Sequence, residues 1–322
     1  MTDLLQSGGD RERILVIKLG AFGDIVLADG AMHDLRLQHP DAHVSVLTRR
    51  AYVPLMRRCP WVDAVVGDDN APRWRLDRMF GLARKLRAGG FVRAYDLQNS
   101  RRSRFYRRLL GNNGCTWSVD PREPDLRLSV PERHARQLHA AGVATVHSRH
   151  PAPGWIADDV SALLDAAAIG RPFVALLPGS SARHPGKRWP HYAACSRALE
   201  QRGIRVVTIP GPDEPGLGLG ADGEHYAGLV LRRHGRALDL HALAGVLQSS
   251  ACVVGNDSGP THLAACLGAP CVALFARHSP ALVSTGIGER ATVLVDEPID
   301  SIAVDAVVAA VLRQSGLVDQ AR

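Results

Sequence analysis

Short apolar runs alternate along the chain with longer segments of helical spacing, and this alternation predicts parallel β-strands joined by α-helices. The proline-rich stretch 121–153 interrupts the pattern and is expected to form a loop. In the first half, the expected strands are 13–19, 43–49, 62–68 and 92–98, and the expected helices are 24–40 and 73–90.

The alternation starts again after this stretch. The strands expected in the second half are 172–180, 204–211, 251–257 and 269–276, and the helices are 160–170, 189–203, 238–250, 259–268 and 301–316. We therefore expect an α/β chain with two Rossmann-like domains, 1–155 and 156–322, that face each other across a cleft. In open α/β sheets, ligands bind outside the carboxyl ends of the strands.

The composition is that of a globular protein, with 322 residues of which 46% are hydrophobic and 22% are charged. The six cysteines are scattered and form no CxxC pair, so we expect reduced core residues and no zinc site or disulfide framework. The polar N-terminus does not resemble a signal peptide, and no apolar run reaches the roughly 18 residues that span a bilayer. We expect a cytoplasmic protein, or one that is peripheral at the inner face of the inner membrane.

The positive charge is concentrated in one segment. The chain has a net charge of +7, and Arg73 to Arg108 holds twelve Lys or Arg and two Asp, so this segment contributes +10 and the remainder −3. Such a concentration favours an anionic partner, namely a phosphorylated glycolipid, a membrane surface or a nucleic acid, although a solvated helix face would look the same. RNP aromatics and zinc fingers are absent, so nucleic acid is not expected.

The first candidate motif is KLGAFGD, Lys18 to Asp24, which follows an expected strand. Gly20 and Gly23 allow a tight turn, but the motif lacks the GxGxxG fingerprint of a dinucleotide site and the Lys-Ser/Thr of a P-loop. Asp24 would lie at the start of a helix. There it could act only as a helix cap, or it could face a ligand.

The second motif is LLPGSSARHPGKRWP, residues 176–190, in which a strand ends in a Pro-Gly-Ser-Ser turn. The hydroxyl and N–H groups of Ser180 and Ser181 could hold phosphate oxygens, and Lys187 adds a point charge that suits a diphosphate. The alternative is an ordinary loop with a surface lysine.

The third motif is VVGNDSGPTHLAACLGAPCVALF, residues 253–275, in which a buried strand leads into a helix. The helix N-terminus offers free N–H groups to an anion, and the small residues Ser258, Gly259 and Thr261 would let a pyrophosphate approach. No G-x-S-x-G elbow is present, so the DSGP sequence does not indicate a serine nucleophile. His262 could be a ligand or a structural histidine.

Together these motifs resemble those of glycosyltransferase family 9, the ADP-heptose:lipopolysaccharide heptosyltransferases. The resemblance rests on ILVIKLGAFGD near the start, LPGSS and KRWP in the middle, GPDE at 211–214, and GNDSGPTHLAACLGAPCVALF, and it covers nearly the whole chain. It implies the GT-B fold, with the acceptor on the N-terminal domain and the nucleotide-sugar on the C-terminal one.

The resemblance also implies a mechanism. Asp24 would be the general base that takes the proton from the acceptor hydroxyl, and a single displacement would invert the anomeric centre. Lys187 and the helix N-terminus would stabilise the leaving diphosphate, so neither a metal nor any other cofactor is implied. The nucleotide-sugar residues implied are Ser180, Ser181, Lys187, Leu238 (through its backbone, by the adenine), Asp257, Ser258, Gly259, Thr261 and His262.

The acceptor in this family is the anionic inner core of lipopolysaccharide. We expect Arg101, Arg102 and Arg104, which follow a strand, to bind its carboxylates or phosphates, together with Gly23 and Gln98. Two alternatives remain open. The enzyme could use another nucleotide-activated sugar, or the chain could be an inactive relative that only binds a nucleotide-sugar or glycolipid.

Overall fold

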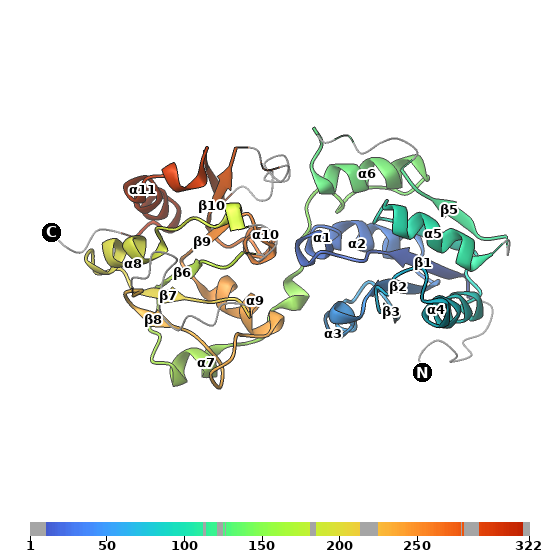
Figure 1. Cartoon of the computed structure of the whole chain (residues 1–322), viewed down its shortest axis with the longest axis horizontal. Helices are drawn as coiled ribbons and strands as arrows, with labels where there is room; N and C mark the ends of the chain where they lie inside the picture. The colour runs from blue at the N-terminus through green and yellow to red at the C-terminus, as the bar shows by residue number, and fades with distance from the viewer. Residues whose placement is uncertain are drawn as a thin grey trace. The chain divides into compact units, whose positions relative to one another are not determined.

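The computed structural model describes residues 11–111, 114–120, 125, 127–180, 185–212, 225–277, 279 and 290–317. The chain divides into two compact units, Met1–Pro151 and Ala152–Arg322 (Figure 1). The domain boundary expected between residues 155 and 156 falls within the short 3-10 helix η2 (Gly154–Ile156).

Unit 1 is built on a five-stranded parallel sheet in the order β3-β2-β1-β4-β5 (Figure 1). Its strands are β1 (Arg13–Ile17), β2 (His43–Arg49), β3 (Ala64–Asp68), β4 (Arg93–Asp96) and β5 (Thr116–Ser118). Its helices are α1 (Phe22–Val26), α2 (Asp29–Gln38), α3 (Val53–Met56), α4 (Leu76–Ala88), α5 (Arg101–Leu110) and α6 (Val130–Ala140), with the 3-10 turn η1 (Arg50–Tyr52).

Unit 2 is built on a six-stranded parallel sheet in the order β11-β10-β9-β6-β7-β8. Its strands are β6 (Val174–Leu177), β7 (Val206–Thr208), β8 (Leu229–Val230), β9 (Cys252–Asn256), β10 (Cys271–Ala276) and β11 (Ala291–Asp296). Its helices are α7 (Ser161–Ala166), α8 (Tyr192–Glu200), α9 (Leu240–Ser249), α10 (Gly259–Cys266) and α11 (Val304–Ser315), with the 3-10 turns η3 (Pro185–Lys187) and η5 (Ile299–Ser301).

Each sheet is buried by helices on its faces, as parallel strands require. In unit 1, apolar residues of α4 and α5, such as Leu86 and Tyr106, pack with Leu15 and Ile17 of β1. In unit 2, α8 and α11 pack over β6, β9 and β10 around Trp189, which is fully buried. Burial of these side chains from water is the main force that holds each unit together.

The structure confirms the α/β prediction, adds strands β5, β8 and β11 and helix α5, and corrects the prediction in two other places. The expected loop contains α6, because Ser129 and Glu132 form a capping box and Pro131 stands in the first turn, where a helix tolerates proline. The helix expected at 24–40 is two helices, because ψ is −15° at Leu27 and −3° at Ala28 and the chain tightens there. The described helices include none that is long and apolar enough to span a bilayer.

Candidate active site

In unit 2, the sheet reverses its direction of winding between two adjacent strands, β6 and β9. The chain runs from β6 outward through β7 and β8, and then returns to β9 and continues through β10 to β11 on the other side. The loops that leave β6 and β9 therefore part in opposite directions, and this switch point is where ligands bind in open α/β sheets. Two of the three candidate motifs follow these two strands.

Asn256, the last residue of β9, ties the two motifs together. Its side-chain amide donates to the carbonyls of Pro178 and Gly179 at 2.9 and 3.3 Å, and its Oδ1 accepts the Trp189 N–H at 3.0 Å. The Trp189 ring is fully buried, and its Nε1 donates to the Ile302 carbonyl at 2.9 Å. The backbone on both sides of Lys187 is thus anchored to the core.

Asp257, the next residue, is the centre of a buried polar cluster. Its Oδ2 accepts hydrogen bonds from Lys187 Nζ at 2.5 Å and from the Ser279 hydroxyl, and His262 Nε2 lies 3.6 Å from Oδ1. Burial pushes the pKa of Asp257 upward, but the hydrogen bonds from His262, Lys187 and Ser279 outweigh it and lower that pKa to about 2. Asp257 is therefore ionised at neutral pH and holds Lys187 in place.

Helix α10 begins directly after this carboxylate, with Ser258 as its N-cap residue. The Ser258 and Thr261 hydroxyls lie 3.2 Å apart, and Thr261 is buried. Gly255 permits this packing, because a Cβ at that position would lie 2.2 Å from Thr261 Oγ1. The first N–H groups of a helix lack partners within it, so the Ser258–Gly259 end can accept an anion beside Lys187.

The other expected nucleotide-sugar residues fall in different places. Ser180 follows β6, and its buried hydroxyl has no hydrogen-bond partner among the residues that the structure describes. Ser181 lies outside the described residues, as do Asp213 and Glu214 of the GPDE motif. Leu238 is half-buried and precedes α9, whose N-cap Asp239 accepts from the N–H groups of residues 241 and 242.

In unit 1, the sheet has its own switch point, between the adjacent strands β1 and β4. The glycine turn of the first motif follows β1, and Gln98 follows β4. Gln98 Oε1 accepts from the N–H groups of Leu19 and Gly20 at 2.8 and 3.2 Å, so this side chain holds the turn. Gly20 has φ +113°, and a Cβ there would lie 2.6 Å from the Tyr52 ring, so the turn requires glycine.

Asp24 lies in the first turn of α1 and is half-buried. Its Oδ2 accepts the Ala21 N–H at 3.0 Å, as a helix cap does, which leaves Oδ1 available for a further contact. Gly23, beside it, is buried within the helix, and its carbonyl accepts from Leu27 N at 2.9 Å.

A buried cationic side chain lies next to this turn. Lys18 is 4% exposed, and its Nζ lies 3.2 Å from both the Leu97 carbonyl and His134 Nε2. Burial lowers the pKa of Lys18, and the carboxylates of Asp24 and Asp96 oppose that shift.

Asp96 ends β4 at the same switch point and is fully buried. Its Oδ1 accepts from the N–H groups of Gln98 and Asn99 at 3.1 and 3.0 Å. Burial raises the pKa of Asp96 to about 6, although the hydrogen bonds from Ser103, Asn99 and Gln98 oppose the shift.

The three arginines expected at the acceptor do not share one environment. Arg102 donates from Nε and Nη2 to the two oxygens of the Asp68 carboxylate, at 3.1 and 3.2 Å, and from Nη1 to Ala71 O at 3.0 Å. This contact joins α5 to β3, so the role of Arg102 is structural. Arg101 and Arg104 are exposed on α5 and remain candidates for an anionic ligand.

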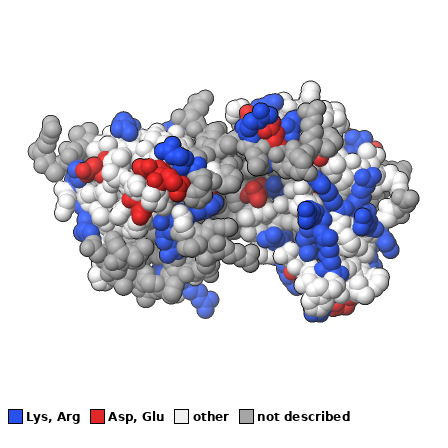
Figure 2. Space-filling model, turned by 45° about the horizontal axis from the view of Figure 1, so that its top comes forward, with Lys and Arg blue, Asp and Glu red and all other residues white. Residues whose placement is uncertain are grey.

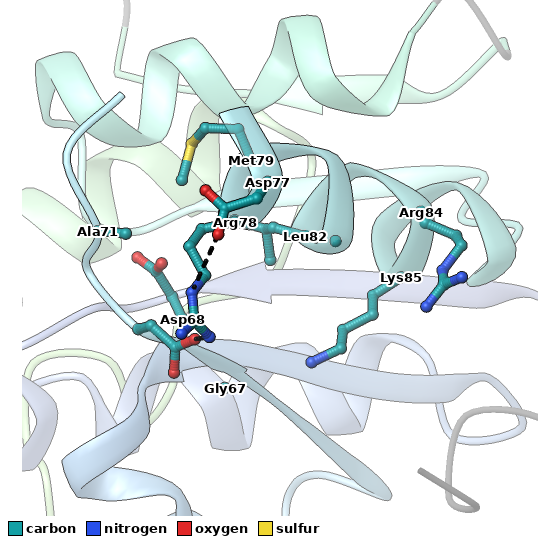
Figure 3. A pocket seen from close by; sticks show the side chains of 11 residues that line it. Gly67, Asp68, Ala71, Asp77, Arg78, Met79, Leu82, Arg84 and Lys85 are labelled. Carbon is teal, nitrogen blue, oxygen red and sulfur yellow. Dashed lines mark hydrogen bonds and ion pairs between the residues drawn. The ribbon is translucent and has the colours of Figure 1, made fainter. Parts of the chain in front are cut away.

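A pocket of unit 1 lies between the carboxyl end of β3 and helix α4 (Figure 3), and its lining includes Asp68 and Ala71, two partners of Arg102. Acidic and basic side chains line it together, and Arg78 joins two of the acids, Asp69 at 3.4 Å and Asp77 at 3.6 Å (Figure 3). Because these charges neutralise one another, the pocket is less suited to bind an anionic substrate than the switch points are.

Reasoning from the sequence missed several residues of both sites. Lys18 and Asp96 were not assigned a role. Each is a charged residue at the end of an apolar run in the sequence, and this pattern predicts a side chain at the carboxyl end of a strand, where ligands bind. Asn256 is an uncharged polar residue in the same kind of position, at the end of β9. Ser279 gave none, because only the tertiary fold brings it to Asp257.

Comparison with known proteins identifies the family of the chain. The model of the family described as glycosyltransferase family 9 (heptosyltransferase) matches residues 79–303. Lipopolysaccharide heptosyltransferase 2 of Salmonella typhimurium is 26% identical over 304 residues, which cover 83% of this chain and 84% of that protein. Lipooligosaccharide heptosyltransferase 2 of Haemophilus ducreyi is 25% identical over 301 residues, which cover 83% of this chain and 84% of that protein.

Solved structures show the same fold. The Escherichia coli ADP-heptose lps heptosyltransferase II matches with a TM-score of 0.73 at 22% identity, covering 94% of this chain and 98% of that one. A glycosyl transferase family 9 protein of Veillonella parvula matches with a TM-score of 0.76 at 18% identity, covering 95% and 97%. The two parallel α/β units thus form a GT-B fold of two Rossmann-like domains. The chain belongs to glycosyltransferase family 9, the heptosyltransferases, and is a glycosyltransferase.

Proposed function

We propose that the protein transfers a heptose from ADP-heptose to the inner core of lipopolysaccharide, with inversion at the anomeric carbon and without a metal ion or other cofactor. The observation that carries the proposal is the cluster at the β6–β9 switch point, where the buried, ionised Asp257 holds the Lys187 ammonium beside the start of α10. The names of the similar proteins supply the donor and acceptor classes.

In this proposal, unit 2 binds the donor. An ammonium group has three N–H donors, and the Asp257 carboxylate uses one, so the others are available to diphosphate oxygens. The N–H groups at the start of α10 add positive potential where the leaving diphosphate gains charge. This arrangement would supply the stabilisation that a divalent cation gives in other transferases.

Unit 1 binds the acceptor and supplies the base. The free oxygen of Asp24 accepts the proton of the attacking hydroxyl as the new C–O bond forms and the bond to the diphosphate breaks. The Gln98 amide holds the glycine turn and so fixes the start of α1, which carries Asp24. Exposed arginines of α5, Arg101 and Arg104, would bind the acidic or phosphorylated sugars of the acceptor, at the cytoplasmic surface of the inner membrane.

Calorimetric titration with ADP, UDP, GDP and CMP tests the donor class. It is followed by turnover of ADP-heptose, in the presence of EDTA, with a panel of inner-core acceptors that differ in the number of heptoses they already carry. We expect ADP to bind most tightly, and NMR of the product to show the inverted anomer with EDTA present. Tighter binding of UDP or GDP would show that the donor is another nucleotide-sugar, while the fold and the proposed site would stand. Nucleotide binding without turnover on any inner-core acceptor would favour the inactive relative.

A further inference from the structure

Helix α4 and the segment before it expose large hydrophobic side chains to solvent. Trp74 is 74% exposed, Leu76 62% and Phe80 71%. The other large hydrophobic side chains that the described residues expose, Leu37, Val92 and Val146, lie far from these in the sequence. Three such residues within one short segment form a patch that a protein surface in water does not normally present.

The patch continues across to helix α5. Leu76 and Phe80 are separated by one helical turn and share a side of α4 with Arg87, whose Nε donates to the Leu109 carbonyl of α5 at 2.9 Å. Arg73 donates to the Arg101 carbonyl at 2.7 Å, and its guanidinium carbon lies 5.0 Å from the centre of the Phe105 ring. The hydrophobic side chains therefore border the outer surface of α5.

That outer surface is strongly basic. Arg101, Arg104, Arg107 and Arg108 are exposed, and none of them forms an ion pair with the carboxylates in the described part of the chain. Figure 2 shows Lys and Arg side chains gathered in a band over α4 and α5. We call this surface, with Trp74, Leu76, Phe80 and these four arginines, the α4–α5 face.

We propose that the α4–α5 face docks the protein on the surface of an anionic phospholipid bilayer. Trp, Phe and Leu insert at the boundary between headgroups and acyl chains, while arginines around them bind lipid phosphates. A second copy of the chain fits poorly, because pairing this face with itself would bring arginine against arginine. A nucleic acid would use the arginines but would leave Leu76 without a partner.

This proposal goes beyond the transferase function and can be tested apart from it, with vesicles that contain no glycolipid. Co-sedimentation with vesicles of phosphatidylglycerol and phosphatidylcholine should show binding that rises with the phosphatidylglycerol fraction. The variant R104Q/R107Q/R108Q should lower the partition coefficient about a hundredfold, since each basic side chain near such a surface contributes a factor of about five. The variant L76S/F80S should lower it about tenfold.

Matched controls come from the same protein. The variant R57Q/R149Q/R290Q removes equal charge from exposed positions outside the face, and L37S/V146S removes two exposed hydrophobic side chains; both should bind vesicles as the unchanged protein does. Trp74 reports insertion directly. Its emission should shift to the blue on vesicle binding, and W74F should lose that shift while it still sediments.

Three results would overturn the proposal. One is vesicle binding that the face variants and the control variants reduce equally. Another is a self-association that L76S/F80S abolishes while vesicle binding stays unchanged. The third is loss of affinity for a single-stranded oligonucleotide in R104Q/R107Q/R108Q without any loss of vesicle binding.

Discussion

The two switch points use charge in opposite ways. At the β6–β9 switch point, the buried Asp257 carboxylate accepts hydrogen bonds from Lys187 and Ser279. At the β1–β4 switch point, Asp24 is half-buried, and its described hydrogen bond is the one from the Ala21 N–H. The Asp257 carboxylate is thus engaged in holding Lys187, whereas Asp24 keeps one oxygen without a described hydrogen bond. This difference underlies our proposal that unit 2 holds the anionic donor and unit 1 accepts the proton.

The largest expected effect is that of Asp24→Asn. An amide cannot accept the proton of the attacking hydroxyl, so kcat should fall by about 10²–10⁴-fold, the usual contribution of a general base. Steady-state turnover of ADP-heptose measures it.

The matched control is Asp305→Asn, which also removes an acidic residue from the first turn of a helix, at an exposed position of α11. If Asp24 only capped its helix, Asp24→Asn would lose about 0.5–2 kcal/mol of stability, Asp305→Asn about 0.3–1 kcal/mol from the helix dipole, and both variants would keep their turnover. Equal turnover in the two variants would show that Asp24 is not the general base, and the proposed difference between the switch points would be wrong.

Lys187→Met should have the next largest effect, a loss of about 10²–10³-fold in kcat, because the leaving diphosphate loses its charged hydrogen-bond donor. It also leaves the Asp257 carboxylate, 7% exposed, without its cation. The double variant Lys187→Met/Asp257→Asn should recover stability and not turnover, measured by urea unfolding and by product formation. Recovery of turnover in the double variant would mean that Lys187 serves only to neutralise Asp257.

Stability should depend on pH in opposite directions in the two units. The pKa of Asp257, lowered to about 2, contributes stability that is present above its ordinary value of 3.8 and is lost as pH falls from about 4 to 2. The pKa of Asp96, raised to about 6, contributes stability that is present below 3.8 and is lost as pH rises from about 4 to 6. Each shift is worth roughly 2–3 kcal/mol.

Hydrogen exchange followed separately in peptides of each unit measures these dependences. Asp96→Asn should flatten the profile of unit 1 between pH 4 and about 6, and leave that of unit 2 unchanged. A unit 1 profile that keeps its slope in this variant would assign the dependence to another group.

Substitution of the glycines in the two turns should have the smallest effects on the protein. The set distinguishes the cost of a steric clash from the cost of an unfavourable backbone conformation. Gly255→Ala lacks room beside Thr261, so it should cost about 1–3 kcal/mol, and Thr261→Ala should relieve much of this. Gly20→Ala also lacks room, beside Tyr52, but Tyr52→Ala should relieve only part of its cost because φ stays at +113°. Gly81→Ala in α4, with nothing within 4 Å, should slightly stabilise the protein. Thermal unfolding of the set would test this, and equal rescue at both turns would contradict it.

Much of the fold was predictable, because buried parallel strands form apolar runs that local reading detects. The strand expected at 43–49 is β2 over the same residues. Helix α6 was missed because Pro131 and the prolines around it in the sequence were counted as loop signals, although Pro131 occupies a position that favours proline. Strands β5 and β8, with three and two residues, were not predicted, and neither were the six-residue strand β11 and helix α5.

The sites were predictable where a motif follows a strand, and not where long-range contacts decide a role. The positions of Asp24, Lys187 and Asp257 follow from strand ends. That Gln98 holds the glycine turn, or that Arg102 is bound to Asp68, depends on contacts between residues far apart in the sequence. Local spacing could not separate Arg102, bound inside the unit, from the exposed Arg101 and Arg104.

The most direct test of this division of roles is a calorimetric titration of ADP into the unchanged protein, Asp24→Asn and Lys187→Met. The account predicts that Asp24→Asn binds ADP with an unchanged Kd, while Lys187→Met binds it at least about tenfold more weakly, the loss of one charge-assisted hydrogen bond. Weaker ADP binding in Asp24→Asn, or an unchanged Kd in Lys187→Met, would contradict it.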